Sequence, residues 1–513
     1  MRKRDRNAGI ILHPASLPSG DGIGDFGINC FDFIDFLSAA GMGIWQILPL
    51  GPTGYGDSPY TALSSFAGNP LFISLEVLAQ DGLIEKVDLK KRPVFSPDTI
   101  DYPEVYLWKV PLLRQAAQAF LQGLDSENKD LYREFCRRER VWLDDFAFFV
   151  TAKEHFDTKA AEEKAENSMW NHFWPEKLSL RDPAEIDRYR GIWEREIEVQ
   201  KVIQYFFSNQ WNRIREYAHE KNIRIFGDIP IFVSPNSSDV WAHPDLFKLD
   251  EKNRMEKVAG VPPDYFSETG QRWGNPLYRW EEHKKTDYSW WVSRIRRAFD
   301  FADMVRIDHF RGFEACWEIP ANEPTAIHGS WVKSPGEELF QVFRREIGRL
   351  PIVAEDLGVI TPEVERLRRK LKFQGMKVLQ FAFESDGYGG LNPDNPFLPH
   401  NYEPDTVVYT GTHDNDTSLG WYTGLSDEFR NLVKAYLGST GDSPVRDMIR
   451  TVFMSVARTA VIPMQDVLNL GSDARMNTPG TVGNNWKWRV RREAFNTDVS
   501  GKLRWLARLY NRL

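Results

Sequence analysis

The stretch Met304-Val305-Arg306-Ile307-Asp308-His309-Phe310-Arg311-Gly312 decides how the rest of the chain is interpreted. Its apolar first half predicts a buried β-strand that ends in polar residues. Side chains two positions apart in a strand point to the same face, so Arg306 and Asp308 should lie together. A guanidinium beside a carboxylate favours the ionised form of that acid. Asp308 is therefore a candidate nucleophile rather than a proton donor.

Two further acids follow strand-like runs. Glu355 ends Pro351-Ile352-Val353-Ala354-Glu355, and Asp414 ends Val407-Val408-Tyr409-Thr410-Gly411-Thr412-His413-Asp414. Retaining sugar transfer needs a carboxylate nucleophile and a carboxylic acid about 5–5.5 Å apart. Glu355 has no adjacent cation, so burial can raise its pKa and keep it protonated. Asp414 can hold substrate hydroxyls. Alternation along the strand leaves open whether Glu355 or Asp356 points inward.

Strands and helices alternate along most of the chain. Gly9–His13 predicts a strand, Cys30–Ala40 a helix with Asn29 as its N-cap, and Ile44–Leu50 a second strand, which implies a parallel pair. Eight strands predict a (β/α)8 TIM barrel with its active site at the C-terminal strand ends. A doubly wound α/β sheet is the alternative, but no glycine-rich loop follows the first strand. The remaining predicted strands are 223–228, 304–308, 351–356, 377–383, 407–414 and 458–463, with helices at about 196–220, 290–301, 337–349 and 362–371.

The length of the chain predicts insertions in this barrel. Its 513 residues exceed the roughly 250–300 at which one core stops growing. We expect a single catalytic domain over residues 1–513, with inserted, mainly helical subdomains at about 51–195 and a lid loop at about 245–280. The final residues, 503–513, have a helical pattern, so no C-terminal β-sandwich is expected.

Composition excludes several classes of partner. A net charge of -8 argues against nucleic acid, because no basic field attracts phosphates. No segment approaches the ~20 apolar residues of a membrane span, and no signal-peptide core follows the basic start. Three widely separated cysteines indicate reduced thiols in the cytoplasm. The 18 Trp, 17 Tyr and 33 Phe serve mainly as core, but such an excess also favours a carbohydrate ligand.

Six motifs resemble the 4-α-glucanotransferases of the amylomaltase (disproportionating enzyme) type, glycoside hydrolase family 77. The similarity runs from the first strand to Arg475-Met476-Asn477 and covers nearly the whole chain. The motifs are Gly54-Tyr55-Gly56-Asp57-Ser58-Pro59-Tyr60, Gly227-Asp228-Ile229-Pro230-Ile231-Phe232-Val233, Val261-Pro262-Pro263-Asp264-Tyr265-Phe266-Ser267-Glu268-Thr269-Gly270-Gln271-Arg272-Trp273-Gly274-Asn275-Pro276, Arg306-Ile307-Asp308-His309-Phe310-Arg311-Gly312, Ala354-Glu355-Asp356-Leu357-Gly358 and Gly411-Thr412-His413-Asp414-Asn415.

The resemblance implies a role for each matching residue. Asp308 matches the family nucleophile, Glu355 the acid/base and Asp414 the transition-state stabiliser, which selects Glu355 over Asp356. Other matches line the donor-sugar subsite: Arg306, Asp228, His309 and His413. The remaining matches contact substrate, with Tyr60 and Trp273 as possible stacking platforms: Ser58, Tyr60, Gln271, Trp273 and Asn477.

The implied activity is retaining transfer from maltooligosaccharides and other α-1,4-glucans to the 4-hydroxyl of glucose or a glucan. Glucose is then both acceptor and product. No cofactor or metal is expected, since retaining transfer needs neither. An α-amylase-like hydrolase and a catalytically silent glucan-binding protein are the alternatives. A proline-containing lid over 261–276 could exclude water and so favour transfer over hydrolysis.

Overall fold

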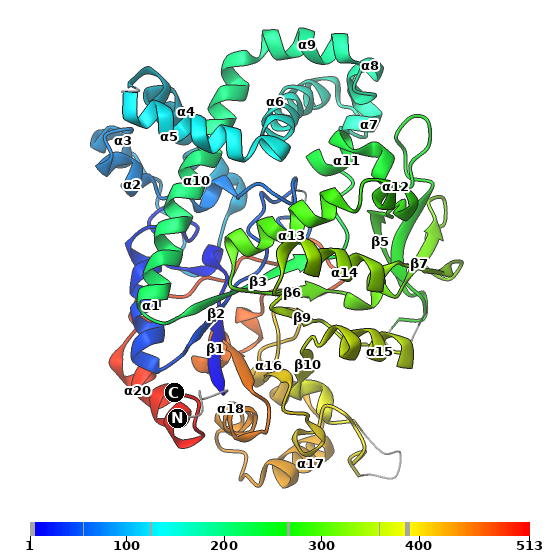
Figure 1. Ribbon diagram of the computed structural model, residues 1–513. Coiled ribbons are helices and arrows are strands. Elements are labelled where there is room, and N and C mark those ends of the chain that lie inside the picture. Colours follow the sequence, from blue (N-terminus) through cyan, green and yellow to red (C-terminus); the bar gives the residue numbers. More distant parts are fainter. Residues whose placement is uncertain (1–5, 55, 124–125, 264–266, 359, 385–389) are drawn as a thin grey trace.

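The computed structural model describes residues 6–54, 56–123, 126–263, 267–358, 360–384 and 390–513 and contains a parallel barrel and a smaller antiparallel sheet (Figure 1). The barrel strands occur in the order β10-β11-β12-β1-β2-β3-β6-β9. Their bounds are β1 (Asn7–Ile11), β2 (Ile44–Gln46), β3 (Arg224–Pro230), β6 (Met304–Asp308), β9 (Ile352–Ala354), β10 (Gly375–Val378), β11 (Thr406–Tyr409) and β12 (Thr459–Pro463).

The two end strands of this sheet close on each other. Val353 in β9 forms a parallel bridge with Gln374, and the Ala354 N–H donates to the Gln374 carbonyl at 2.8 Å. Closure leaves no free sheet edge, and helices cover the outside (Figure 1). All eight predicted strands are present, so the predicted (β/α)8 barrel is confirmed.

Alternation along β6 divides its side chains between two cores. Val305 and Ile307 pack in the layer between the barrel and its helices, whereas Met304 packs inside the barrel. Arg306 and Asp308 share the inward phase of Met304. β3 pairs with β6 in parallel, which brings Asp228 opposite Arg306. The polar ends of adjacent strands therefore meet at one mouth of the barrel.

The helices that cover the barrel match the predicted ones closely. They are α1 (Ile28–Ala40), α10 (Glu194–Glu220), α13 (Ser289–Phe301), α14 (Gly336–Ile347), α15 (Pro362–Leu371), α18 (Pro444–Met454) and α20 (Thr497–Leu509). The predicted N-cap at Asn29 is wrong, because α1 begins at Ile28 and Gly27 is its cap. Asp25 fixes this start by accepting the Gly27 N–H at 2.8 Å.

Several predicted strands are too long, among them 44–50, 377–383 and 407–414. β10 ends at Val378, and Leu379–Ala382 forms the short 3-10 helix η5 instead of extending the strand to Phe383. The Gln380 side chain donates to the backbone carbonyl of Asp416 at 2.9 Å. This turn thus supports the loop after β11, a function that the apolar pattern of the sequence did not show.

Between β2 and β3 the chain forms a helical layer at the top of Figure 1. Much of the aromatic composition is used here as core; for example, Phe148 and Trp241 stack with ring centroids 5.4 Å apart. No helix in the described part of the chain is long and apolar enough to cross a membrane. The helices of this region are α2 (Leu75–Gln80), α3 (Lys86–Leu89), α4 (Tyr102–Gly123), α5 (Ser126–Arg138), α6 (Arg140–Glu163), α7 (Trp170–Phe173), α8 (Glu176–Ser179) and α9 (Pro183–Ile192).

A second sheet, which the sequence pattern did not reveal, lies at the right of Figure 1 in the order β5-β4-β7-β8. Its strands are β4 (Lys257–Val261), β5 (Gln271–Pro276), β7 (Ala315–Pro320) and β8 (Ser330–Lys333). β7 follows β6 after the 3-10 turn η4 (Phe310–Phe313), so this sheet is attached directly to the strand that carries Asp308. It therefore places Gln271–Pro276 of the motif beside that strand, whereas residues 264–266 of the motif lie outside the described residues.

Candidate active site

Arg306 links two carboxylates at the barrel mouth. Its Nη2 donates to Asp308 Oδ1 and its Nη1 to Asp228 Oδ2, both at 2.6 Å. Burial disfavours the charge on Arg306, but Asp228 and Asp308 outweigh this and raise its pKa well above the ordinary value. The guanidinium is therefore a permanent cation that orients Asp308, as alternation in the strand predicted.

Glu355 immediately follows β9. Its Oε1 accepts the Leu357 N–H at 2.7 Å and its Oε2 the His309 N–H at 2.8 Å. His309 adopts a left-handed conformation (φ 51°), which is uncommon outside glycine, and its N–H donates to Glu355. Burial, and secondly the charge of Asp308, raise the pKa of Glu355 to about 8. At pH 7 this carboxyl is mostly protonated.

Asp356 points away from Glu355 and has a structural role. It accepts the Met376 N–H at 2.7 Å and forms an ion pair with Arg368 at 3.1 Å. Asp356 thus connects the end of β9 to β10 through Met376 and to α15 through Arg368. Of the two acids between which strand alternation could not choose, Glu355 is the one bonded to the turn beside Asp308, through the His309 N–H.

Asp414 lies in the loop after β11 rather than at the strand end, where the sequence pattern placed it. β11 ends at Tyr409, and the hydrogen bonds of the Thr412–Asn415 turn replace the predicted ladder. Asn477 donates to Asp414 Oδ1 at 2.6 Å, and His413 Nε2 lies 3.3 Å from Oδ2. Burial favours protonation of Asp414, but His413 and Asn477 overcome it and hold the pKa well below its usual range.

Tyr60 joins the two halves of the site. Its hydroxyl donates to Asp228 Oδ2 at 2.8 Å and lies 2.9 Å from His413 Nε2. Its ring stacks on His413 with centroids 5.3 Å apart, so part of the predicted sugar platform is already occupied by the histidine. Ser58 accepts the Tyr60 N–H at 3.3 Å and supports this turn.

Gln271 and Trp273 on β5 form the other wall. The Trp273 indole N–H donates to Gln271 Oε1 at 3.1 Å, and its ring is perpendicular to that of His309 at 4.7 Å. Trp273 remains 38% exposed, so it offers an open aromatic surface. Burial lowers the pKa of His309 to about 4, which leaves its ring neutral at pH 7. The predicted site residues are thus brought together by contacts with residues of the barrel mouth or of β5.

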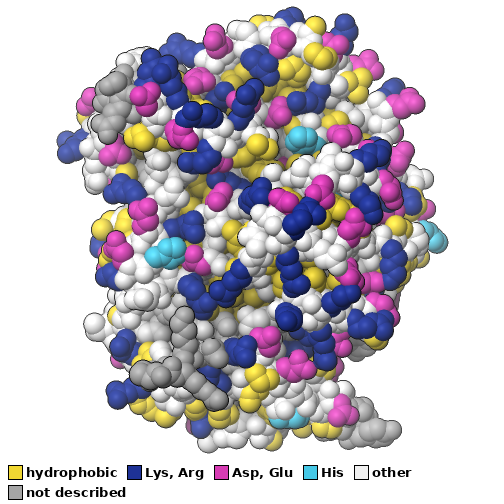
Figure 2. Space-filling model, viewed as in Figure 1, with side chains coloured by type: hydrophobic (Ala, Val, Ile, Leu, Met, Phe, Trp, Pro, Cys, Tyr) yellow, Lys and Arg dark blue, Asp and Glu magenta, His cyan; other side chains and the backbone are white. Residues whose placement is uncertain are grey.

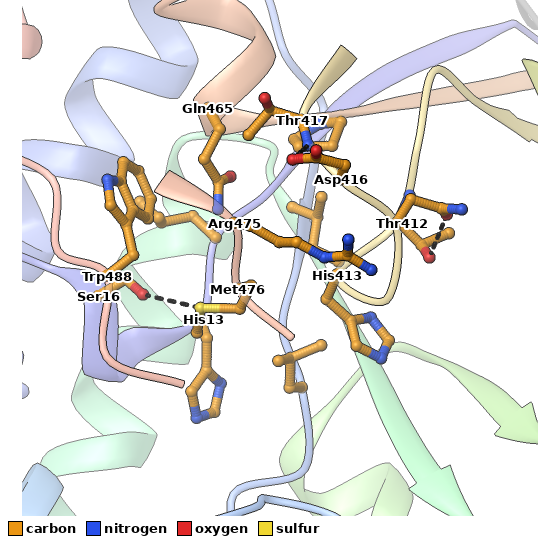
Figure 3. A pocket seen from close by; sticks show the side chains of 15 residues that line it. His13, Ser16, Thr412, His413, Asp416, Thr417, Gln465, Arg475, Met476 and Trp488 are labelled. Atoms are coloured by element: carbon orange, nitrogen blue, oxygen red, sulfur yellow. Dashed lines mark hydrogen bonds between the residues drawn. The ribbon is translucent and has the colours of Figure 1, made fainter. Parts of the chain in front are cut away.

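Sequence reasoning missed two residues of this region. Figure 3 shows His13 and Arg475 in the wall of a cavity beside the loop that carries His413. Burial, and secondly His413, lower the pKa of His13 to about 3. His13 follows the first strand, so the rule of strand-end polar residues could have identified it. Arg475 follows no strand directly, and spacing gave no such signal.

One group of acids has the spacing of a cation site. Oxygens of Asp21, Asp25 and Glu76 lie within 4.8 Å of one another. However, Arg92 pairs with Asp21 at 2.8 Å and with Glu76 at 2.6 Å, and Lys109 lies 3.9 Å from both aspartates. These two cations offset most of the negative charge of the three acids, so the cluster is an ion-pair network that joins α4 to the segment after β1.

Comparison with known proteins identifies the family of the chain. The family model described as 4-alpha-glucanotransferase matches residues 12–495. A 4-alpha-glucanotransferase of Thermus thermophilus is 46% identical over 99% of both chains, and one of Synechocystis is 45% identical over 99% of this chain and 98% of its own. The structure of the amylomaltase of Streptococcus agalactiae in complex with acarbose superposes with a TM-score of 0.93, at 38% identity over 99% of each chain. These matches show that the chain belongs to the 4-alpha-glucanotransferase family, glycoside hydrolase family 77.

Proposed function

We propose that this 4-alpha-glucanotransferase acts by double displacement, with Asp308 as nucleophile, Glu355 as acid/base and Asp414 as transition-state stabiliser. The observation that carries the proposal is the opposite treatment of neighbouring acids. Arg306 is bonded to Asp308, whereas burial keeps the pKa of Glu355 near 8. A retaining site needs one ionised and one protonated carboxyl group.

In the first step, the Asp308 carboxylate attacks C1 of the donor sugar. The bond from C1 to the glycosidic oxygen breaks, and Glu355 gives its proton to that oxygen, so the leaving sugar departs as an alcohol. Asp414 stays ionised, because its pKa is held low, and stabilises the positive charge that develops on the ring. The product is an ester between C1 and Asp308.

In the second step, Glu355 is a carboxylate and acts as the base. It removes the proton of an acceptor 4-hydroxyl, whose oxygen attacks C1 while the bond to Asp308 breaks. The donors are maltooligosaccharides or longer α-1,4-glucans, and glucose serves as acceptor and accumulates as product. The acarbose bound to the Streptococcus agalactiae amylomaltase supports an oligosaccharide ligand of this kind.

Transfer requires that an acceptor sugar reach the ester before water. The segment at about 245–280 acts as the lid, with Trp273 as the acceptor platform beside His309. The helices of 51–195 are insertions in one catalytic domain over residues 1–513. The free cysteines Cys30, Cys136 and Cys316 support a reducing, cytoplasmic location.

The test is incubation with maltotriose, following glucose and longer oligomers. We expect glucose together with a ladder of longer products. Glucose and maltose alone would indicate the hydrolase, and no product would indicate the silent glucan-binding protein.

The nucleophile is tested separately with Asp308→Ala. Removing the attacking oxygen should lower kcat at least about 1,000-fold while the thermal midpoint stays within a few degrees of the wild-type value. An Asp308→Ala variant that keeps full activity would show that the ester forms elsewhere.

A further inference from the structure

Asp414 is held by side chains rather than by the barrel ladder. The loop that carries it leaves β11 at Tyr409, so no strand pairing fixes its position. Its carboxylate contacts Asn477 and His413, and its backbone carbonyl accepts from Arg475 Nη2 at 2.9 Å. The position of the carboxylate therefore depends on the segment after β12.

Arg475 also bonds to Asn477. Its Nε donates to the Asn477 carbonyl at 2.8 Å, while the Asn477 amide donates to Asp414 Oδ1 at 2.6 Å. The three residues form a closed ring of hydrogen bonds. Rotation of Asn477 or displacement of Asp414 would break at least one bond of this ring. In Figure 3 the Arg475 side chain extends from its own segment toward the loop of Thr412 and His413.

The segment around Arg475 is itself anchored on both sides. Gln465 donates to the Ala474 carbonyl at 3.2 Å, and the Trp486 N–H donates to the Met476 carbonyl at 2.7 Å. The backbone on both sides of Arg475 is therefore held in place by hydrogen bonds. A guanidinium is planar and presents several donors in fixed directions, which suits a bridge between two carbonyls better than the single ammonium of lysine.

We propose that Arg475 is a positioning residue that fixes Asp414 and Asn477 relative to each other for glucan transfer. The inference rests on the proposed role of Asp414 in the transition state. Arg475 acts through the other two residues and need not touch the sugar. Its loss should lower the rate of the chemical step and leave ground-state binding nearly unchanged, because a small displacement of a catalytic group reduces the rate steeply.

The variants Arg475→Met and Arg475→Lys test this in the maltotriose assay. For Arg475→Met we expect kcat to fall about 10- to 100-fold with KM changed less than about threefold. Arg475→Lys keeps the charge but cannot bridge both carbonyls in the same geometry, so its kcat should lie between those of Arg475→Met and the wild type. It also remains informative if Arg475→Met does not fold.

Arg489→Met is the matched control. Arg489 also ties the C-terminal part of the chain to backbone carbonyls, donating to those of Ser19 and Ser96 at 2.8 Å each, but its hydrogen bonds within the described residues do not reach the Asp414 loop. It should lose thermal stability while kcat stays within about twofold of the wild-type value. An equal fall of kcat in both variants would mean that Arg475 is merely structural, and would overturn the proposal.

A double-mutant cycle with Asn477→Ala gives the second measurement. If Arg475 acts through Asn477 and Asp414, the double variant should be about as slow as the slower single variant. The proposal would be overturned if the fall in kcat of the double variant equalled the product of the two single effects. It would also be overturned if a folded Arg475→Met variant kept the wild-type kcat. If the wild type transfers glucan but the variants give either of these results, only the role of Arg475 is rejected. If the wild type itself is inactive, the proposed function is rejected as well.

Discussion

At the scale of single residues, the three acids at the barrel mouth lie in different electrostatic environments. Asp308 is bonded to a guanidinium, Glu355 is buried with its pKa raised to about 8, and the pKa of Asp414 is held low by His413 and Asn477. The backbone N–H groups of His309 and Leu357 oppose the shift of Glu355, but burial dominates. The environment of each acid, rather than its residue type, distinguishes the roles proposed for the three acids.

The raised pKa of Glu355 predicts the alkaline limb of the pH profile. The first step needs the protonated acid, so kcat/KM for maltotriose should fall as pH rises through about 8. A maltosyl fluoride donor needs no proton on its leaving group. The Glu355→Gln change should therefore lower kcat/KM for maltotriose about 100-fold or more. The rate of fluoride release from maltosyl fluoride should fall far less. Equal losses with both donors would contradict the assignment of Glu355 as the acid.

At the scale of elements, the pairing of β4 with β5 brings Trp273 against His309, the residue after Asp308. A Cβ on Gly260 would lie 2.3 Å from the Gln271 carbonyl oxygen, so glycine permits the close approach of β5. Arg272, Gly260, Trp317 and Trp331 are paired in one row across the sheet. Since side chains alternate, Trp273 points to the opposite face, toward His309.

This geometry provides a matched pair of tryptophans. Trp273→Ala should raise the ratio of hydrolysis to transfer by about 2- to 10-fold, the factor that corresponds to an aromatic contact of roughly 0.5–1.5 kcal/mol. Trp331 is similarly exposed, at 40% against 38%, but lies on the other face. Trp331→Ala should leave the ratio unchanged. Glucose and oligomer yields from maltotriose measure both, and an equal effect of the two changes would rule out a specific acceptor platform at Trp273.

At the scale of the whole molecule, a buried ion-pair network ties the inserted helices to the barrel. Lys109 on α4 is fully buried, donates to the Leu71 carbonyl at 2.7 Å, and lies 3.9 Å from Asp21 and Asp25. Burial raises the pKa of Asp25 to about 6, and Lys109 opposes this shift. On the face of the molecule in Figure 2, positive and negative side chains are intermingled. Ion pairs between exposed side chains contribute less to stability than the buried network does.

Lys109→Met should cost about 3–5 kcal/mol of unfolding free energy at pH 8, because the buried Asp25 carboxylate loses the cation 3.9 Å away, while Asp21 keeps its pair with Arg92. Asp25 has a raised pKa in the folded state, so its stabilising effect is complete at low pH and is lost as pH rises through the folded value. Removing Lys109 raises that pKa further, so the cost should be smaller at pH 5. Urea unfolding at both pH values measures the difference.

Lys91→Met is the control for this prediction. Lys91 also pairs with an aspartate, Asp88, at 2.8 Å, but its side chain is 70% exposed. The change should alter the unfolding free energy by less than about 0.5 kcal/mol at either pH. Similar costs for the two lysines would mean that the network around Asp21 and Asp25 is not buried in solution.

The sequence alone determined the barrel and its catalytic strand, because both depend on local periodicity. Apolar runs fixed eight strands, and alternation along β6 put Arg306 and Asp308 on one face. The family motifs then named Glu355 and Asp414. These signals are carried by residues that are adjacent or two apart, which a single chain displays directly.

Only the tertiary structure decided the features that depend on distant segments. The four-stranded sheet pairs residues up to tens of positions apart, Asp356 turns toward Met376 and Arg368, and Arg475 reaches the Asp414 loop from beyond β12. The same holds for the pKa of Glu355, since burial arises from packing and not from neighbours in sequence. Periodicity gives the direction of a side chain, but its partners are chosen by the closure of the barrel.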